Sequence, residues 1–287
     1  MEHKIFVSIA SYRDRQTQNT VNNLLKNAKY PRNIRIAVVE QNLDCDSFSC
    51  SHKKDSVKVL RLREGKGPAH ARFLASTLWK GEKWYLQIDS HTIFVKNWDI
   101  LVINDLKKCG PRSVLTCYPP AKLPLENVTI RSITENWKLD HQDHIIAQGK
   151  ITPGAENPSL GIFVSAGFLF FEAAPFLNEI PFDPNLKFLF QGEEILLSAR
   201  LFTRGWKIYH PSVCVCAHDY IRNDDPKVWN DSPFFWKNNK EVVRKYRFIT
   251  HQLKDNVPTG TAFIYGVGNS RSIEDWKKAI GLTKLFD

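Results

Sequence analysis

The chain has 287 residues, of which 43% are hydrophobic and 24% are charged, and its formal net charge at pH 7 is +10. This length suffices for one large α/β domain or two small ones with a substantial core. The positive charge favours anionic ligands such as nucleotide diphosphates, nucleic acid or an acidic protein. Basic residues are scattered among Trp, Asp and Glu rather than massed in one tract, so we expect no nucleic-acid partner.

No part of the sequence has the pattern expected of export or membrane insertion. The apolar run at residues 5–10 is too short for a secretory signal. The longest apolar stretch, residues 160–177, is interrupted by Glu172 and Pro175 and suits a buried strand better than a membrane helix. The six cysteines lack paired zinc spacing and are expected to be reduced thiols. We therefore predict a cytoplasmic protein with no membrane partner.

Strands and helices alternate in the first ninety residues. Buried strands are predicted at four apolar runs, residues 5–10, 34–39, 57–62 and 84–88. Helical spacing follows the first and the third run, over residues 17–27 and 68–78. This βαβ rhythm predicts a parallel sheet. The fourth strand leads directly into Asp89-Ser90-His91, at the kind of strand end where open α/β sheets bind ligands.

The alternation weakens after residue 98. A helix is predicted over residues 99–107 and a strand over 114–117, whereas the polar, turn-rich residues 118–160 predict a long irregular loop that would serve an acceptor or a partner. The remaining predicted elements are a strand at 162–171, a helix at 193–204, a strand at 208–216 that leads to His218, and amphipathic helices around 236–246 and 273–280. The apolar faces of the last helices would permit a homodimer, although such faces more often pack on their own domain.

Three polar side chains form a candidate metal site. Asp89 and His91 are two residues apart, so in extended or turn geometry their side chains point the same way. Oxygen and nitrogen ligands together suit manganese or a similar ion, and His218 would reach the same sheet edge from a later strand. A turn with local hydrogen bonds would also explain the first two residues, and a lone histidine is often structural. The combination favours a metal site.

A basic, glycine-containing segment, residues 61–72, leads into the second predicted helix. Glycines permit close approach of backbone to a ligand, and a helix N-terminus faces anions. Arg63 and Arg72, together with a metal ion, would neutralise a diphosphate. A solvated basic loop in front of a helix would explain the same residues.

Two further segments have a functional and a structural interpretation. Glu193 and Glu194 begin a predicted helix, where carboxylates commonly complement the helix dipole, but one of them could bind sugar hydroxyls or the acceptor. The small residues of Ser165-Ala166-Gly167 would let a sugar lie against backbone, and close strand packing would explain them equally well.

Taken together, these segments resemble nucleotide-sugar glycosyltransferases of the GT-A fold. The motifs Asp89-Ser90-His91, Gly192-Glu193 and His218, with residues 62–65, occur in the same order as in polypeptide N-acetylgalactosaminyltransferases. The segments 6–14, 67–72 and 192–194 more specifically resemble the cytoplasmic UDP-N-acetylglucosamine transferases that modify hydroxyproline on the adaptor subunit of SCF-type ubiquitin ligases. The resemblance covers about residues 4–250 and thins over 118–160.

The resemblance implies one α/β domain over residues 1–287, with the GT-A (Rossmann-like) mixed, mainly parallel central sheet flanked by helices. Residues 1–117 would form a nucleotide-binding half. Residues 118–287 would form an acceptor-binding half together with the C-terminal helices.

The resemblance also implies a set of site residues. The metal, Mn²⁺ or else Mg²⁺, would be held by Asp89, His91 and His218. The uridine pocket would be lined by Ser11, Tyr12, Arg13 and Gln41, with the neighbouring Glu40 as an alternative reader of the base. The diphosphate would face Arg72, Asp89 would belong to the nucleotide-sugar site as well as to the metal site, and the donor sugar would contact Gly167 and Glu193. Either Glu193 or Glu194 would act in catalysis by placing the acceptor hydroxyl.

The activity implied is transfer of N-acetylglucosamine from UDP-GlcNAc to a hydroxyproline, with retention of configuration. We favour front-face attack over a double displacement, which needs a carboxylate beneath the anomeric carbon that sequence does not locate. Acceptors other than hydroxyproline remain alternatives, namely hydroxylysine, Ser/Thr or a glycan. A non-catalytic binder of nucleotide sugars or nucleic acid is a second alternative; a degenerate transferase should lack a metal ligand, and none is lacking.

Overall fold

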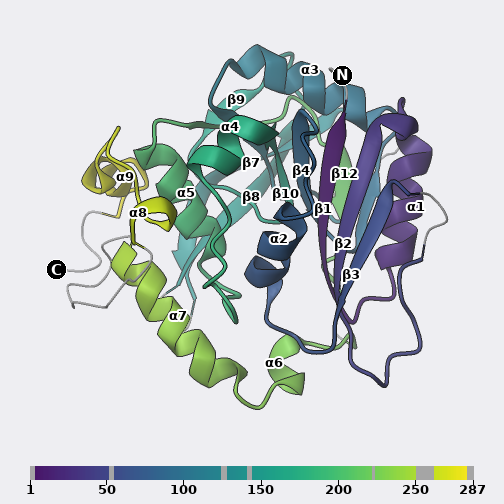
Figure 1. Ribbon diagram of the computed structural model, residues 1–287. Helices are drawn as coiled ribbons and strands as arrows, with labels where there is room; N and C mark the ends of the chain where they lie inside the picture. The colour runs from purple at the N-terminus through teal and green to yellow at the C-terminus, as the bar shows by residue number, and fades with distance from the viewer. Residues whose placement is uncertain are drawn as a thin grey trace.

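The computed structural model describes residues 4–51, 55–123, 128–140, 144–221, 224–249 and 262–282. Its centre is an eight-stranded sheet with the order β3-β2-β1-β4-β10-β6-β11-β9 (Figure 1). The strands of this sheet are β1 (Ile5–Tyr12), β2 (Ile34–Gln41), β3 (Val57–Leu62), β4 (Trp84–Asp89), β6 (Ser113–Thr116), β9 (Ser159–Gly161), β10 (Phe168–Glu172) and β11 (Lys207–His210). Strands β3, β2, β1 and β4 run parallel, as do β6 and β11, whereas β10 and β9 are antiparallel to their neighbours. The predicted mixed, mainly parallel sheet is confirmed.

Helices cover both faces of the sheet. The helices described are α1 (Thr17–Asn27), α2 (Pro68–Ser76), α3 (Trp98–Cys109), α4 (Ala173–Glu179), α5 (Glu193–Thr203), α6 (Val228–Asp231), α7 (Phe235–Ile249), α8 (Ala262–Tyr265) and α9 (Ile273–Ala279). Helices α1 and α3 pack on the face that receives Ile5, Val7 and Ile9 of β1. Helices α2, α4 and α5 pack on the face that receives Phe6. Alternate residues of each strand therefore fill two separate apolar layers.

The alternation along β4 decides where the candidate site lies. Trp84, Leu86 and Ile88 point into the layer of α1 and α3, and Tyr85 points into the layer of α2 and α5. Asp89, the last residue of the strand, has the same parity as Tyr85. Its carboxylate consequently emerges at the carboxyl edge of the parallel strands, on the side of α2 and α5.

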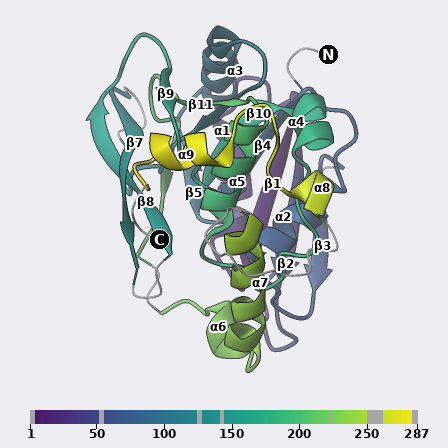
Figure 2. The same cartoon turned by 90° about the vertical axis from the view of Figure 1, so that its left-hand side faces the viewer.

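The prediction of a long irregular loop at residues 118–160 is wrong. This region contains the antiparallel strands β7 (Ile130–Leu139) and β8 (Ile145–Pro153), together with the edge strand β9; residues 124–127 and 141–143 lie outside the described part. Figure 2 shows the β7–β8 ribbon along one side of the molecule, next to α9. Ile145 and Ala147 pack there against Trp276. Many residues of the ribbon are exposed, so its sequence lacks a clear apolar alternation that would predict strands. The ribbon is stabilised by this contact with a helix distant in the sequence.

Two predicted strands have different limits. The strand expected at 162–171 begins only at Phe168, because hydrogen bonds to side chains hold the backbone of Ser165 and Ala166 in an irregular path. The strand expected at 208–216 is split by Pro211 into β11 and β12 (Cys216–His218), and β12 pairs with β5 (Thr92–Phe94) in a separate two-stranded sheet.

Other expectations agree with the structure. The core aromatics Phe6, Trp84 and residues 168–171 are buried. All six cysteines are free thiols. No helix in the described ranges is long and apolar enough to cross a membrane. The division into a nucleotide-binding and an acceptor-binding half stays a prediction.

Candidate active site

A cavity of about 590 Å³ opens at the carboxyl ends of β1, β2 and β4. The N-termini of α2 and α5 border it through Gly67 and Gly192, whose φ angles are 88° and 97°. Positive φ values of this kind are accessible to glycine without strain, so both helices can begin abruptly at the cavity wall. Both helices thus begin beside a space large enough for a ligand.

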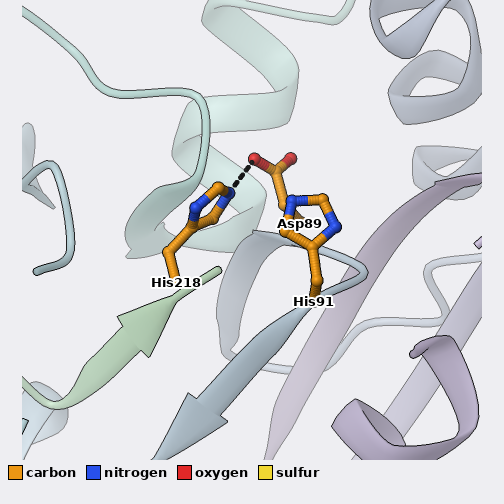
Figure 3. Close-up of side chains that lie close together, drawn as sticks. All are labelled: Asp89, His91 and His218. Atoms are coloured by element: carbon orange, nitrogen blue, oxygen red, sulfur yellow. Dashed lines mark hydrogen bonds and ion pairs between the residues drawn. The ribbon is translucent and has the colours of Figure 1, made fainter. Parts of the chain in front are cut away.

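Asp89, His91 and His218 converge at the floor of this cavity (Figure 3). Ligand atoms of the three side chains lie within 4.8 Å of one another. The pairing of β5 with β12 creates this arrangement, because its register places Thr92 opposite His218 and so brings the preceding His91 close. The imidazole centroids of His91 and His218 are 4.5 Å apart.

Asp89 lies in a strongly cationic surrounding. Its Oδ1 accepts a hydrogen bond from Arg72 at 2.9 Å, and its Oδ2 is 3.1 Å from Nε2 of His218. Burial raises the pKa of this carboxyl, but the hydrogen bond with His218 and the charge of Arg72 outweigh burial and hold the pKa well below its usual range. Asp89 is therefore an anion over the whole physiological pH range.

Asp14 orients His91. Its Oδ2 accepts hydrogen bonds from Ser90 Oγ at 2.5 Å and from His91 Nδ1 at 2.8 Å. A neutral His91 that donates from Nδ1 presents the lone pair of Nε2, which is the arrangement found in metal-ligating histidines with a carboxylate behind them.

The donor set fits a divalent metal ion. One carboxylate and two imidazoles offer oxygen and nitrogen together, a combination that suits Mn²⁺ and related borderline ions. The buried Nδ1 of His218 has no hydrogen-bond partner within the described ranges, which is unusual for a histidine that serves only the fold. Among the described residues this is the one cluster of three such groups with metal-binding geometry.

Arg72 joins two carboxylates across the cavity. It is buried, and it contacts both Asp89 and Glu193, the first residue of α5. Burial raises the pKa of Glu193, with Arg72 opposing that effect. The side chain of Arg72 thus ties α2, β4 and α5 together.

Glu194 holds the irregular segment before β10. Its Oε1 accepts a hydrogen bond from Ala166 N–H at 2.6 Å, and its Oε2 accepts one from Tyr118 Oη–H. Burial raises the pKa of Glu194 to about 7, the partners only reducing that effect. Gly167 follows at once, and a Cβ built there would lie 3.1 Å from Asp89 Oδ2. The backbone at Gly167 can therefore lie against the carboxylate only because no side chain intervenes.

The other end of the cavity is lined by Ser11, Tyr12 and Gln41, and their contact with uridine stays a prediction. Gln41 Oε1 accepts a hydrogen bond from Lys66 N–H at 2.7 Å. Glu40 points elsewhere and bonds Cys50 N–H and Ser49 Oγ–H, so of the two neighbouring residues Gln41 is the one at the cavity.

The structure does not bring two of the predicted basic residues to the cavity. Arg13 is ion-paired with Asp46 at 2.8 Å and with Asp231 at 2.9 Å and is not part of the cavity wall. The Arg63 side chain is 87% exposed beside Asp44. The backbone of Arg13 has a φ of 46°, in the left-handed region. In contrast, Arg72 does line the cavity.

Several lining residues were not found from sequence. Tyr118, Ile146 and Trp229 belong to regions without a clear periodic pattern. The position of Asp14 after the polar end of a strand could have indicated a site residue. Its contact with His91 could not be predicted, because the two residues are far apart in the sequence.

A protein-family model described as Glycosyltransferase (GlcNAc) matches residues 4–60 and 50–286. No curated protein sequence matches the chain.

Two solved structures match the chain, and the first of them is similar in fold. The crystal structure of GalNAc-T7 with UDP, GalNAc and Mn²⁺ has a TM-score of 0.60 and 16% sequence identity, and the match covers 97% of this chain and 55% of that chain. This chain therefore spans about half the length of that relative. The mannosyltransferase PcManGT from Pyrobaculum calidifontis in complex with GDP-Man and Mn²⁺ has a TM-score of 0.49 and 11% identity, with 89% of this chain and 66% of that chain covered. The first likeness confirms the predicted fold class.

Proposed function

Because the chain belongs to the Glycosyltransferase (GlcNAc) family, we propose that it transfers N-acetylglucosamine from UDP-GlcNAc to a protein hydroxyl group with the help of a divalent metal ion. The observation that carries the proposal is the convergence of Asp89, His91 and His218, with ligand atoms within 4.8 Å of one another, at the floor of the cavity. GalNAc-T7, whose fold is similar, has been solved with UDP, GalNAc and Mn²⁺, which supports a nucleotide-sugar donor and a metal of this kind.

The donor would lie across the carboxyl ends of β1, β2 and β4. Ser11, Tyr12 and Gln41 would contact uridine, with Gln41 better placed than Glu40 to read the base. Asp89, His91 and His218 would hold a divalent ion, whose chemical contribution would be positive charge beside the departing diphosphate. Arg72 would add a second cation beside it. Arg13 and Arg63 are left out of this proposal, since both side chains lie away from the cavity.

The sugar would lie against Gly167, where the absence of a side chain leaves room beside Asp89. Glu193 would contact sugar hydroxyls, and Glu193 or Glu194 would position the acceptor hydroxyl at the anomeric carbon. We propose retention by front-face attack. Hydroxyproline on a cytoplasmic ubiquitin-ligase adaptor is the acceptor we propose, and the sequence resemblance of segments 6–14, 67–72 and 192–194 supports it.

Isothermal titration of UDP into the protein tests the donor site. Binding is measured with MnCl₂ and with EDTA for wild type, for Asp89→Asn, and for the control Glu135→Gln on the exposed outer part of the ribbon. Wild type and control should bind UDP tightly with metal, and Asp89→Asn should lose at least about a hundredfold in affinity. UDP binding that is indifferent to EDTA and to Asp89 would sink the proposed function.

Transfer is tested separately. Radiolabelled UDP-GlcNAc, UDP-GalNAc and GDP-mannose are each offered with peptides that contain hydroxyproline, hydroxylysine, serine or threonine. Label should pass from UDP-GlcNAc to the hydroxyproline peptide. Transfer from another donor alone would assign the site to a different sugar.

A further inference from the structure

The backbone of residues 165–167 lies at the cavity and is held in place by side chains. Ala166 N–H donates a hydrogen bond to Glu194 Oε1 at 2.6 Å, and the Ala166 carbonyl accepts one from Gln87 Nε2 at 2.8 Å. Ala166 is therefore fixed on both sides. Gly167, the next residue, is the position against which the donor sugar would lie. We call the backbone of residues 165–167 the platform.

Tyr118 fixes the carboxylate that holds the platform. Its hydroxyl donates a hydrogen bond to Glu194 Oε2, while Oε1 of the same carboxylate accepts the N–H of Ala166. The Tyr118 side chain packs on the apolar cluster that contains Trp276 of α9. Gly149 of β8 leaves room for it, because a Cβ built there would lie 2.8 Å from Tyr118 Cβ. Tyr118 is itself anchored, so it can hold Glu194 in one orientation.

The two glutamates at the start of α5 differ in what they can offer a ligand. Both line the cavity, but both oxygens of Glu194 already accept hydrogen bonds from the protein. Glu193 accepts a hydrogen bond from Arg72 at Oε2, and in the part of the chain that the structure describes its Oε1 has no hydrogen-bond partner. Glu193 therefore has an oxygen to offer a substrate hydroxyl, whereas Glu194 has both of its oxygens engaged.

We propose that Tyr118 and Glu194 are positioning residues for the donor sugar: Tyr118 holds Glu194, Glu194 holds Ala166 N–H, and the platform so fixed keeps the sugar beside Asp89. This inference rests on the proposed function, and it leaves Glu193 as the carboxylate that meets the acceptor hydroxyl. A platform that shifts would misplace the anomeric carbon relative to the acceptor, and small misplacements slow a transfer strongly.

The inference separates binding of the sugar from binding of the nucleotide. Tyr118 follows β6, which lies on the other side of β4 from β1 and β2, the strands that end at Ser11 and Gln41. UDP bound at that end would not touch the platform. Loss of the Tyr118 hydroxyl should therefore slow transfer of the sugar and leave the affinity for UDP unchanged, a division that general damage to the fold would not produce.

Tyr118→Phe removes only the hydroxyl, and Tyr30→Phe, at a side chain that is 44% exposed and outside the cavity, is its control. Tyr118→Phe should lower kcat/KM for UDP-GlcNAc by at least about tenfold, measured with the peptide that the wild type labels best. Its affinity for UDP with MnCl₂, measured by isothermal titration, should equal that of the wild type. Tyr30→Phe should change neither quantity. Equal values of kcat/KM for the two variants would overturn the inference, while transfer by the wild type left the proposed function standing.

Position 194 separates positioning from direct action on the substrate. Glutamine keeps an oxygen for Ala166 N–H and can donate its amide N–H to Tyr118 Oη, so Glu194→Gln should recover most of the transfer rate that Glu194→Ala loses. The double variant Tyr118→Phe/Glu194→Ala should be no slower than Glu194→Ala, because both changes act through Ala166. A Glu194→Gln variant as slow as Glu194→Ala would overturn the inference. Failure of the wild type to label any peptide would overturn the proposed function and the inference with it.

Discussion

The two parts of the chain are built by different rules. In the first part, residues 4–116, strands β1 to β4 are parallel and have six to eight residues each, and helices α1 and α2 connect β1 to β2 and β3 to β4. In the second part, residues 128–282, strands β9, β10, β11 and β12 have three to five residues each, and the long ribbon β7–β8 pairs within itself. Strands β1 to β4 pair with one another. Several strands of the second part pair with strands of the first part that are distant in the sequence.

Both parts contribute to the candidate site, and they meet in one buried ion-pair group. Asp89 and Arg72 come from the first part, and Glu193 comes from the second. His91 and His218 are divided in the same way. Removing a contact that joins the two parts should therefore lower the free energy of unfolding more than removing a contact within either part.

The largest effect is expected for Arg72→Met. This change leaves the buried carboxylate of Glu193 and the partly exposed carboxylate of Asp89 without their shared cation, so the free energy of unfolding should fall by about 3–5 kcal/mol at pH 8 in EDTA. The loss should shrink at pH 5, because burial raises the pKa of Glu193 and the carboxyl can take up a proton there. Urea denaturation at both pH values measures it.

The matched control for this variant is Arg63→Met, in which the exposed side chain should change stability by less than about 0.5 kcal/mol. It should also leave UDP binding unchanged, contrary to the expectation from sequence. A loss for Arg72→Met no greater than that for Arg63→Met would show that the two parts are joined elsewhere.

The next effect concerns Glu194, whose pKa burial raises to about 7. The folded protein keeps a proton on Glu194 at pH values where the unfolded chain, with its ordinary pKa of 4.5, has released it. Wild-type stability therefore falls as pH rises from about 4.5 to about 7. Glutamine at position 194 cannot titrate. Between pH 5 and pH 8 the free energy of unfolding of Glu194→Gln should therefore rise by about 2 kcal/mol relative to that of wild type, less than the full pKa shift implies because solvent in the cavity screens the charge. Denaturation of both proteins at each pH measures this difference. A difference in the free energy of unfolding between Glu194→Gln and wild type that is the same at pH 5 and pH 8 would contradict the raised pKa of Glu194.

Sequence predicted the first part well for an identifiable reason. Helix α1 has the predicted limits, and β1, β2 and β4 exceed theirs by one or two residues at the carboxyl end, where Ser11, Gln41 and Asp89 are polar but still paired. Apolar runs and helical spacing are local signals, and burial on both faces of a parallel sheet makes them strong. Asp89 and His91 could be proposed as metal ligands because they stand at the end of such a strand, β4.

In the second part, helices α5, α7 and α9 lie where residues 193–204, 236–246 and 273–280 were predicted to be helical, but the strand pairings could not be predicted in the same way. The pairing of Thr92 with His218 joins residues far apart in the chain through two strands of only three residues each. Nothing near Ile146 indicates that it lines the cavity, since this depends on how α9 holds β8. Arg63 shows the opposite error, because its basic character pointed to the diphosphate while its position leaves it in solvent.

A smaller effect is expected for Asp14→Asn, which acts on the site from the first part alone. The substituted amide has one acceptor oxygen where the carboxylate has two, so it cannot serve both Gln16 N–H and His91 Nδ1, and it lacks the negative charge that makes the imidazole a stronger ligand. Mn²⁺ affinity in the presence of UDP should fall about tenfold, or about 1.4 kcal/mol. Titration of Mn²⁺ followed by its electron paramagnetic resonance signal measures this. Asp44→Asn, whose side chain is exposed, is the control, and equal affinities for both variants would exclude a role for Asp14 in metal binding.

The smallest effect is expected at the far end of the second part. Ser272 caps α9, its Oγ accepting the N–H of Asp275 at 2.9 Å, and α9 supports Ile145 through Trp276. Ser272→Ala should lower the free energy of unfolding by about 1 kcal/mol, while the exposed Ser270→Ala changes it by less than about 0.5 kcal/mol. Far-ultraviolet circular dichroism and NMR signals of the α9 amides should be followed in the same urea series. If the two parts unfold as one cooperative unit, both probes shift together; if the second part docks weakly on the first, only the α9 amides shift. No shift in either probe would contradict the cap itself.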